Sequence, residues 1–466
     1  MRAIRLCLVP LLAMAVASAC GGRTPLLLFG GEEAPEGGAG TELDAGTVPF
    51  DARPPVDAPP PVDAHPPEDA HFDVPEERPV LDTGSDVLIT PILSCGSGFG
   101  VQPGAPWPMD RRCPSRTASF PIPGSTSAKE AWHLDARGEW DSAPVIDTSG
   151  VVYIHDTARG VVAIAHDGSE LWATPLEGQF APSLAIGTDG TVYVWNGALS
   201  ALQRDGTPSW TVSPASNPAD VPIAMGGDGT VRVLGSPPSG VPTLYAVDST
   251  GATVLEVALL QSGAVQSPLT MGPDGSMYVL VASRLLAMTP GGQPVWSAPL
   301  GPVDGTVVIS VGVDGTIYVP AGQGNPSGVT AFTAAGTRRW TTTLTDGPTN
   351  QLAVADDGSS FVATGGGLFE LNPDGSTAWF YESDGPEGAV IADGTSAGYA
   401  PFINYPPGTT TANVVRFAAS GAATWAIPVN GVPLALGADG TVYAGVVSGT
   451  SLSPQTVYTS LLAIAR

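Results

Sequence analysis

Few residues of this 466-residue sequence have the types and spacing that catalysis or metal binding would require. Its four cysteines include no adjacent pair, and its five histidines stand singly. No Walker or His-Glu-x-x-His motif is present, so the sequence offers no phosphate loop or zinc-binding helix, and its one Gly-x-Ser-x-Gly stretch, residues 394–398, falls within the repeat region. The sequence therefore predicts no catalytic, cofactor-binding or metal-ligating residue.

Aspartates are numerous, and a carboxylate could serve as an acid or a base. Of the 20 aspartates after residue 130, however, 13 directly precede a glycine, as in Asp189-Gly190 and Asp439-Gly440. Between two runs of alternating apolar residues, Asp-Gly predicts a tight hairpin turn, because glycine readily adopts a positive φ. A structural role in turns is sufficient to account for these aspartates.

The composition excludes two broad classes of protein. With 59 Gly and 47 Pro, the chain cannot be a helical bundle or a coiled coil. A nucleic-acid-binding protein needs a basic face, whereas this chain has a net charge of −26 and one lysine, Lys129.

The N-terminus has the pattern of an export signal. Arg2 and Arg5 precede an apolar run over residues 6–16, which is too short to span a bilayer. Residues 1–19 are therefore predicted to be a signal peptide. Small residues ending at Cys20 resemble a bacterial lipobox, so we expect lipidation of Cys20; the alternative is an ordinary signal-peptidase site with an incidental cysteine.

Two segments separate this signal from the rest of the chain. Residues 31–90 carry 15 acidic residues against two arginines and repeat Pro-Pro-x-Asp/Glu units. We predict that residues 20–90 are a lipid-anchored, disordered acidic linker. Residues 91–130 are predicted to be a short junction in which Cys95 and Cys113 form a disulfide, the alternative being two free thiols.

From residue 131 to the C-terminus, one sequence unit is written eight times. Its first part is a Gly followed three residues later by an aromatic residue, as in Gly190-Thr-Val-Tyr193. Its second part is a Gly followed four residues later by Trp, as in Gly206 and Trp210. The Trp position is filled by Trp132, Trp172, Trp210, Trp296, Trp340, Trp379 and Trp425, and by Leu255 in one copy.

These positions recur every 38 to 46 residues, and each interval holds four short strand-like runs separated by turns. Four antiparallel strands per unit are typical of a propeller blade, which buries its faces only when blades stack in a ring. We therefore predict an all-β fold, an eight-bladed β-propeller over residues 131–466. The seven tryptophans are predicted to pack between blades, each burying about 150–250 Å².

The last unit lacks its Trp-bearing fourth strand, because the chain stops at Arg466 after the third. The missing strand is present at the other end of the repeat region, around Trp132. The N-terminal strand is therefore predicted to complete the last blade and close the ring.

The units ending at Trp172 and Gly251 resemble the tryptophan-docking repeat of PQQ-like β-propellers. That family includes quinoprotein alcohol dehydrogenases and the lipoprotein scaffold of the outer-membrane β-barrel assembly machine. Its quinone-binding members use an adjacent Cys-Cys pair, a calcium site and a catalytic Asp. Because this sequence has no adjacent cysteines, the resemblance implies the fold and does not imply a bound quinone.

Strand order predicts that the loops between second and third strands lie on one face of the ring. Four of them are long, over residues 235–242, 320–328, 401–413 and 446–459. Long loops on a rigid scaffold often carry binding sites, so Phe402 and Tyr405 are candidate anchors for a partner. Harmless insertion is the alternative interpretation.

We therefore expect an exported, lipid-anchored propeller in the outer membrane, facing the periplasm or the cell surface. Its predicted function is non-catalytic binding or scaffolding of envelope proteins or of an extracellular ligand. Two alternatives remain open, a quinone-dependent oxidoreductase and a surface-displayed module that binds glycans or peptides.

Overall fold

The computed structural model describes residues 95, 99–235, 240–303, 305–321, 327–382, 388–402, 412–447 and 457–466. Within them the chain forms strands β1 to β33. No helix in this described part is long and apolar enough to cross a membrane. The predicted signal peptide, Cys20 and the acidic linker lie outside the described residues.

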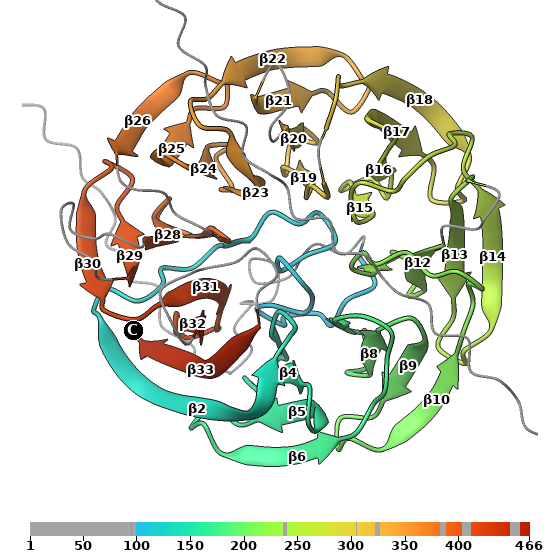
Figure 1. Ribbon diagram of the computed structural model, residues 1–466, viewed down its shortest axis with the longest axis horizontal. Coiled ribbons are helices and arrows are strands. Elements are labelled where there is room, and N and C mark those ends of the chain that lie inside the picture. The colour runs from blue at the N-terminus through green and yellow to red at the C-terminus, as the bar shows by residue number, and fades with distance from the viewer. Residues whose placement is uncertain are drawn as a thin grey trace, which may run out of the picture. The chain divides into compact units, whose positions relative to one another are not determined.

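The strands form eight four-stranded antiparallel blades arranged in a ring (Figure 1). Blade 1 contains β3 (Val145–Ile146), β4 (Val152–Asp156), β5 (Gly160–Ile164) and β6 (Glu170–Thr174). Blade 2 contains β7 (Ser183–Ile186), β8 (Val192–Trp195), β9 (Leu199–Leu202) and β10 (Pro208–Val212). Blade 3 contains β11 (Ala224–Met225), β12 (Val231–Gly235), β13 (Thr243–Val247) and β14 (Thr253–Ala258). Blade 4 contains β15 (Thr270–Met271), β16 (Met277–Val281), β17 (Arg284–Met288) and β18 (Pro294–Pro299).

The second half of the ring repeats this order. Blade 5 contains β19 (Ser310–Val311), β20 (Ile317–Ala321), β21 (Gly328–Phe332) and β22 (Arg338–Thr343). Blade 6 contains β23 (Pro348–Val354), β24 (Ser360–Thr364), β25 (Gly367–Leu371) and β26 (Thr377–Glu382). Blade 7 contains β27 (Ile391–Asp393), β28 (Gly398–Phe402), β29 (Asn413–Phe417) and β30 (Ala423–Ile427), and blade 8 contains β31 (Gly431–Leu436), β32 (Val442–Val446), β33 (Tyr458–Ala465) and β2 (Lys129–Trp140).

The N-terminal strand closes the ring, as predicted. Strand β2 pairs antiparallel with β33, with Trp132 opposite Ala463. Its far end continues into blade 1, where Trp140 pairs with Asp156 of β4. Strand β2 therefore pairs with both the last blade and the first blade, and so connects the two ends of the repeat region.

Burial along a blade follows its place in the ring. Strands β4 and β5 are buried at every residue, because a neighbouring blade covers each of their faces. The outermost strand alternates between exposed and half-buried residues, as β14 does. The aromatic and β-branched residues of the repeat thus fill the space between blades, while polar residues of the fourth strands face outward.

The tryptophans dock each blade onto the next one. On six of the fourth strands the indole N–H donates to the carbonyl two residues before the turn glycine of the following blade, and on β30 Trp425 donates instead to Ser125, which precedes β2. At Gly206 a side chain has no room, because an added Cβ would lie 2.6 Å from the Trp172 ring. The seven bonds run from Trp132 to His166, Trp172 to Arg204, Trp210 to Ser249, Trp296 to Ala334, Trp340 to Pro373, Trp379 to Ala419 and Trp425 to Ser125, at 2.8–3.0 Å.

Part of the predicted junction is built into the ring and does not lie outside it. Residues 99–128 run across the inside of the ring, before β2 begins (Figure 1). Their strand β1 (Ser119–Phe120) pairs in parallel with β27 and adds a fifth strand to blade 7. The boundary expected at residue 131 therefore separates the repeat region from a segment that packs inside the ring. Both belong to one folded unit.

Candidate functional site

Residues 107–118, here called the hub, fill the axis of the ring. Hub carbonyls accept backbone N–H groups from the first strands of six of the eight blades, so these six are tied to the centre. The inner strands are short, and their inward-facing N–H groups would otherwise be buried without an acceptor. The bonds run from Ile146 to Trp107, Ile186 to Pro108, Met271 to Pro114, Val311 to Ser115, Val354 to Thr117 and Ala392 to Ala118, at 2.7–2.9 Å.

Two buried arginines of the hub extend this pattern with their side chains. Arg116 donates to the carbonyls of Leu269 and Ile223, at 3.1 and 2.7 Å. Arg111 donates to the Gln351 side chain at 2.9 Å and to the Leu352 carbonyl. Burial lowers the pKa of each guanidinium to about 10, so both remain charged at neutral pH.

The disulfide between Cys95 and Cys113 joins the middle of the hub to the segment that precedes it. The two Cα atoms lie 5.5 Å apart, and the bond closes a loop with a sequence separation of 18. The hub is therefore held by a covalent bond at Cys113 and by hydrogen bonds to the blades around it.

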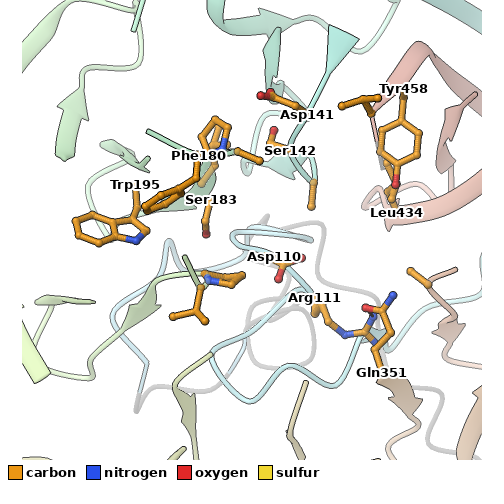
Figure 2. A pocket seen from close by; sticks show the side chains of 18 of the residues that line it. Asp110, Arg111, Asp141, Ser142, Phe180, Ser183, Trp195, Gln351, Leu434 and Tyr458 are labelled. Carbon is orange, nitrogen blue, oxygen red and sulfur yellow. Dashed lines mark hydrogen bonds between the residues drawn. The ribbon is translucent and has the colours of Figure 1, made fainter. Parts of the chain in front are cut away.

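A cavity of about 750 Å³ is lined by the hub residues Trp107, Asp110 and Arg111. Figure 2 shows Asp110 and Arg111 on the hub, at the floor of this cavity. We call it the axial cavity. Most of its wall residues precede or begin first strands, such as Ser142 and Ser183, or follow second strands, such as Thr157. First strands end at the Asp-Gly turns, so the axial cavity lies on the opposite side, the loop face, where binding was expected.

Three carboxylates line the axial cavity. The Asp110 side chain, 22% exposed, accepts a bond from Arg116 at 3.2 Å. The Asp141 side chain, 14% exposed, contacts the Nδ1 atom of His155 at 2.6 Å. Asp220 stands at the rim, where partial burial raises the pKa of its carboxyl group. The site is acidic, and its one lining arginine is already hydrogen-bonded to blade 6.

The remaining wall is mostly apolar and aromatic. Phe180 packs edge-on against Trp195, with ring centroids 6.0 Å apart. On the other side Figure 2 shows Leu434 and Tyr458, which both belong to blade 8. Carboxylates beside apolar walls form a site suited to a cationic group on an apolar stem.

The sequence-based choice of binding anchors was wrong for Phe402. This residue ends β28, is fully buried, and packs against Phe417 with centroids 5.3 Å apart. Strand β28 continues up to Phe402, so its phenyl ring is packed between blades and is not exposed to a partner. Tyr405 and most of the four long loops lie outside the described residues.

Sequence reasoning also missed the residues that line the axial cavity. Asp110 and Arg111 lie in the segment interpreted as a junction, and Asp141 and Asp220 lie in links between blades. No motif marks them, because they meet only after the ring has closed. The available signal was the cluster of three arginines at residues 111–116 in a chain with few basic residues.

The residues on the axis do not fit a bound quinone. The cofactor of the quinoprotein relatives is a polycarboxylate, whereas the axial cavity presents three aspartates and an occupied arginine. The disulfide joins cysteines far apart in sequence, and within the described ranges no three His, Cys, Asp or Glu residues are grouped to hold a metal ion. The hub itself fills the ring centre beneath the cavity.

Comparison with solved structures shows the fold. The chain superimposes on BamB from Moraxella catarrhalis with a TM-score of 0.54 and 19% identity, covering 72% of this chain and 97% of that one. It superimposes on quinohemoprotein alcohol dehydrogenase from Comamonas testosteroni with a TM-score of 0.58 and 12% identity, covering 77% and 81%. Among curated protein sequences, none matches this chain significantly.

A family model gives the more specific assignment. The model described as outer membrane protein assembly factor BamB matches residues 125–224 and 281–435, which together are more than half of the chain. The first match begins at the residues that close the ring, and the second ends in blade 8. The chain therefore belongs to the BamB family of PQQ-like β-propellers.

Proposed function

We propose that this protein is an exported, lipid-anchored propeller that binds or scaffolds proteins of the cell envelope without catalysing a reaction. Membership of the BamB family supports a binding module associated with the envelope. The signal peptide at 1–19, the lipid on Cys20 and the acidic linker belong to this proposal, and they lie outside the described residues.

One observation carries the proposal. The axis of the ring is filled by the chain's own hub, tied by backbone hydrogen bonds to six blades. This leaves a cavity with a closed floor on the loop face, lined by groups that suit recognition. A rigid ring with one such recess is a surface for holding a partner.

Cross-linking in intact cells, followed by purification in mild detergent and identification of the bound proteins, tests this function. Recovery of envelope proteins is the expected result, and outer-membrane assembly subunits would point to the role of the family's namesake. Absorbance of a bound quinone in the purified protein, without any protein partner, would contradict the proposal in favour of the oxidoreductase alternative.

The anchor is tested separately with Cys20→Ala. The protein should partition into the detergent phase of a two-phase separation, and the variant should remain in the aqueous phase. If the unchanged protein is also found in the aqueous phase, Cys20 carries no lipid.

A further inference from the structure

The axial cavity carries negative charge that the described residues balance only in part. Arg116 offsets Asp110 through their contact at 3.2 Å. The guanidinium of Arg111, the basic residue of the lining, is bound to Gln351 and Leu352. Two carboxylates on the walls, those of Asp141 and Asp220, have no cation from Lys or Arg beside them among the described residues.

Asp220 is the more open of these two carboxylates. It lies at the start of blade 3, on the rim, and forms no hydrogen bond or ion pair with any residue that the structure describes. Partial burial there disfavours its charge and raises its pKa. A cation placed against this carboxylate would restore the interaction energy that desolvation removes.

The surroundings of Asp220 select the kind of cation. Val221 and Pro222 follow it on the same wall, and Phe180 and Trp195 stand on blade 2 beside it. Lysine and arginine side chains have a methylene stem that packs on such surfaces and a charged head that reaches a carboxylate. A small hydrated metal ion would gain nothing from these apolar walls.

Building on the proposed function, we propose that the axial cavity receives a lysine or arginine side chain on an extended loop of a partner protein. The cationic head pairs with Asp220, and Asp141 and Asp110 add to the attractive field. The stem lies against Phe180, and the net charge of −26 steers basic partners toward the protein.

The test compares two peptide pools on the purified full chain. Both are acetylated, amidated pentapeptides with random flanks; one pool has lysine at the centre and the other has norleucine. Binding is measured by retention and mass spectrometry in about 150 mM salt, which screens long-range attraction. We expect the lysine pool to be retained at least about tenfold better than the norleucine pool.

Variants separate the cavity from the overall charge. Asp220→Asn should abolish the preference for lysine without changing the melting temperature, because Asp220 has no internal partner in the described structure. Glu256→Gln removes the same charge from the outer wall on β14 and should leave the preference intact. Equal retention of the two pools, an unaffected Asp220→Asn variant, or equal losses in both variants would overturn the proposal.

Two further results distinguish a lysine side chain of a partner protein from a free amine as the source of the cationic group. If cadaverine displaces the lysine pool as effectively as a lysine peptide does, the site recognises free amines and the partner-loop proposal is overturned. If envelope proteins are still recovered by cross-linking while the lysine pool shows no preference, this inference fails and the proposed function stands.

Discussion

The Arg232 guanidinium donates to the carbonyl of Pro290 at 2.7 Å, in the place where a tryptophan docks at seven other seams of the ring. Pro290 lies two residues before the turn glycine Gly292, the position that accepts the indole N–H elsewhere. Blade 3 carries Leu255 at the tryptophan position and Arg232 at the aromatic one. The arginine thus satisfies the carbonyl, but it does not fill the space of an indole.

A cavity of about 410 Å³ remains at this seam, lined by Val257, Leu286 and Met288 among others. Replacing Leu255 with Trp should therefore stabilise the protein, by about 0.5–2 kcal/mol, as cavity-filling changes commonly do. Denaturant unfolding measures the gain. Val254→Trp, on the same strand with its side chain on the opposite face, is the control and should give no gain; equal effects of both variants would contradict the docking account.

The turn glycines that receive a tryptophan should be far less tolerant of substitution than other turn glycines. Gly206 has φ +85° and its added Cβ would lie 2.6 Å from Trp172. Gly229 has φ +79° and nothing within 4 Å. Both Ala variants incur the left-handed backbone cost of about 1–2 kcal/mol, but only Gly206→Ala also displaces an indole. Equal losses of unfolding free energy would refute the role of the contact.

The hub should be essential to the ring, and Arg116 is its most connected side chain. Arg116→Met leaves Asp110 and three carbonyls, those of Leu269, Pro222 and Ile223, without this donor. We expect a loss of about 3–5 kcal/mol in unfolding free energy, as for a buried pair with one partner removed. Arg137→Met, on the exposed side of β2, is the control and should change stability little. A small effect of Arg116→Met would show that the hub merely fills space.

The disulfide should stabilise the hub through the unfolded state. Closing a loop of this length removes chain entropy worth about 3 kcal/mol. The double variant with serine at positions 95 and 113 should lose a comparable amount in unfolding free energy. The same loss should follow reduction of the unchanged protein, and insensitivity to reductant would argue against the bond.

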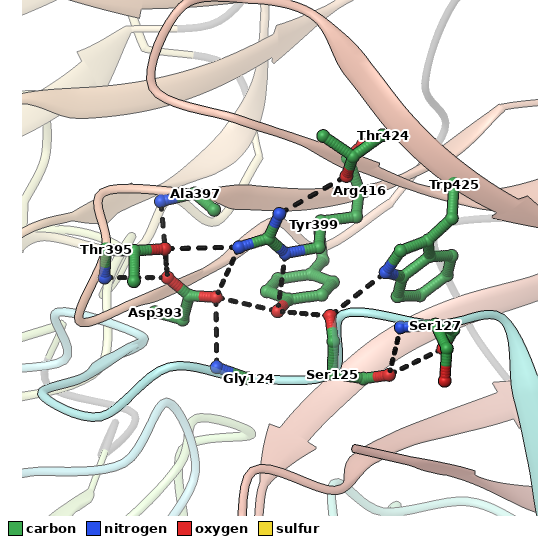
Figure 3. A network of polar contacts seen from close by, with 10 residues as sticks. All are labelled: Gly124, Ser125, Ser127, Asp393, Thr395, Ala397, Tyr399, Arg416, Thr424 and Trp425. Atoms are coloured by element: carbon green, nitrogen blue, oxygen red, sulfur yellow. Dashed lines mark hydrogen bonds and ion pairs between the residues drawn. The ribbon is translucent and has the colours of Figure 1, made fainter.

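Acid should unfold the protein partly through the network around Asp393 (Figure 3). Burial raises its pKa, but bonds from Thr395, Tyr399 and backbone amides outweigh burial, and the pKa of Asp393 is lowered. A carboxylate whose folded pKa lies below the unfolded value of about 3.9 stabilises the fold above that pH. The stabilisation is lost as the pH falls through the folded pKa.

The unfolding free energy should therefore decrease below about pH 4, and more gently in Asp393→Asn than in the unchanged protein. The variant is also less stable at neutral pH, because Arg416 loses its partner at 3.3 Å. Glu256→Gln should keep the original slope. Identical slopes in all three proteins would mean that other carboxylates govern acid unfolding.

The blades could be predicted because their sequence repeats. The hub could not, because residues 107–118 are not part of the repeat. Trp132 and Arg466 fixed the closure in advance, because a missing strand at one end matched a surplus strand at the other. Hub residues such as Arg111 and Arg116 adopt φ values of +58° and +54°, which no local pattern indicates. They are held there by contacts with several blades, which arise only in the closed ring. Phe402 failed as an anchor because the predicted loop began too early in a strand.

The most direct test of the account places a photoreactive residue in the axial cavity of the full chain in living cells. Phe180 on its wall is replaced by p-benzoylphenylalanine, and Leu171 on the exposed outer strand β6 serves as the control position. The account predicts covalent protein adducts from position 180 that disappear when Asp220→Asn is added. Adducts formed only from position 171, or adducts at 180 that ignore Asp220, would contradict it.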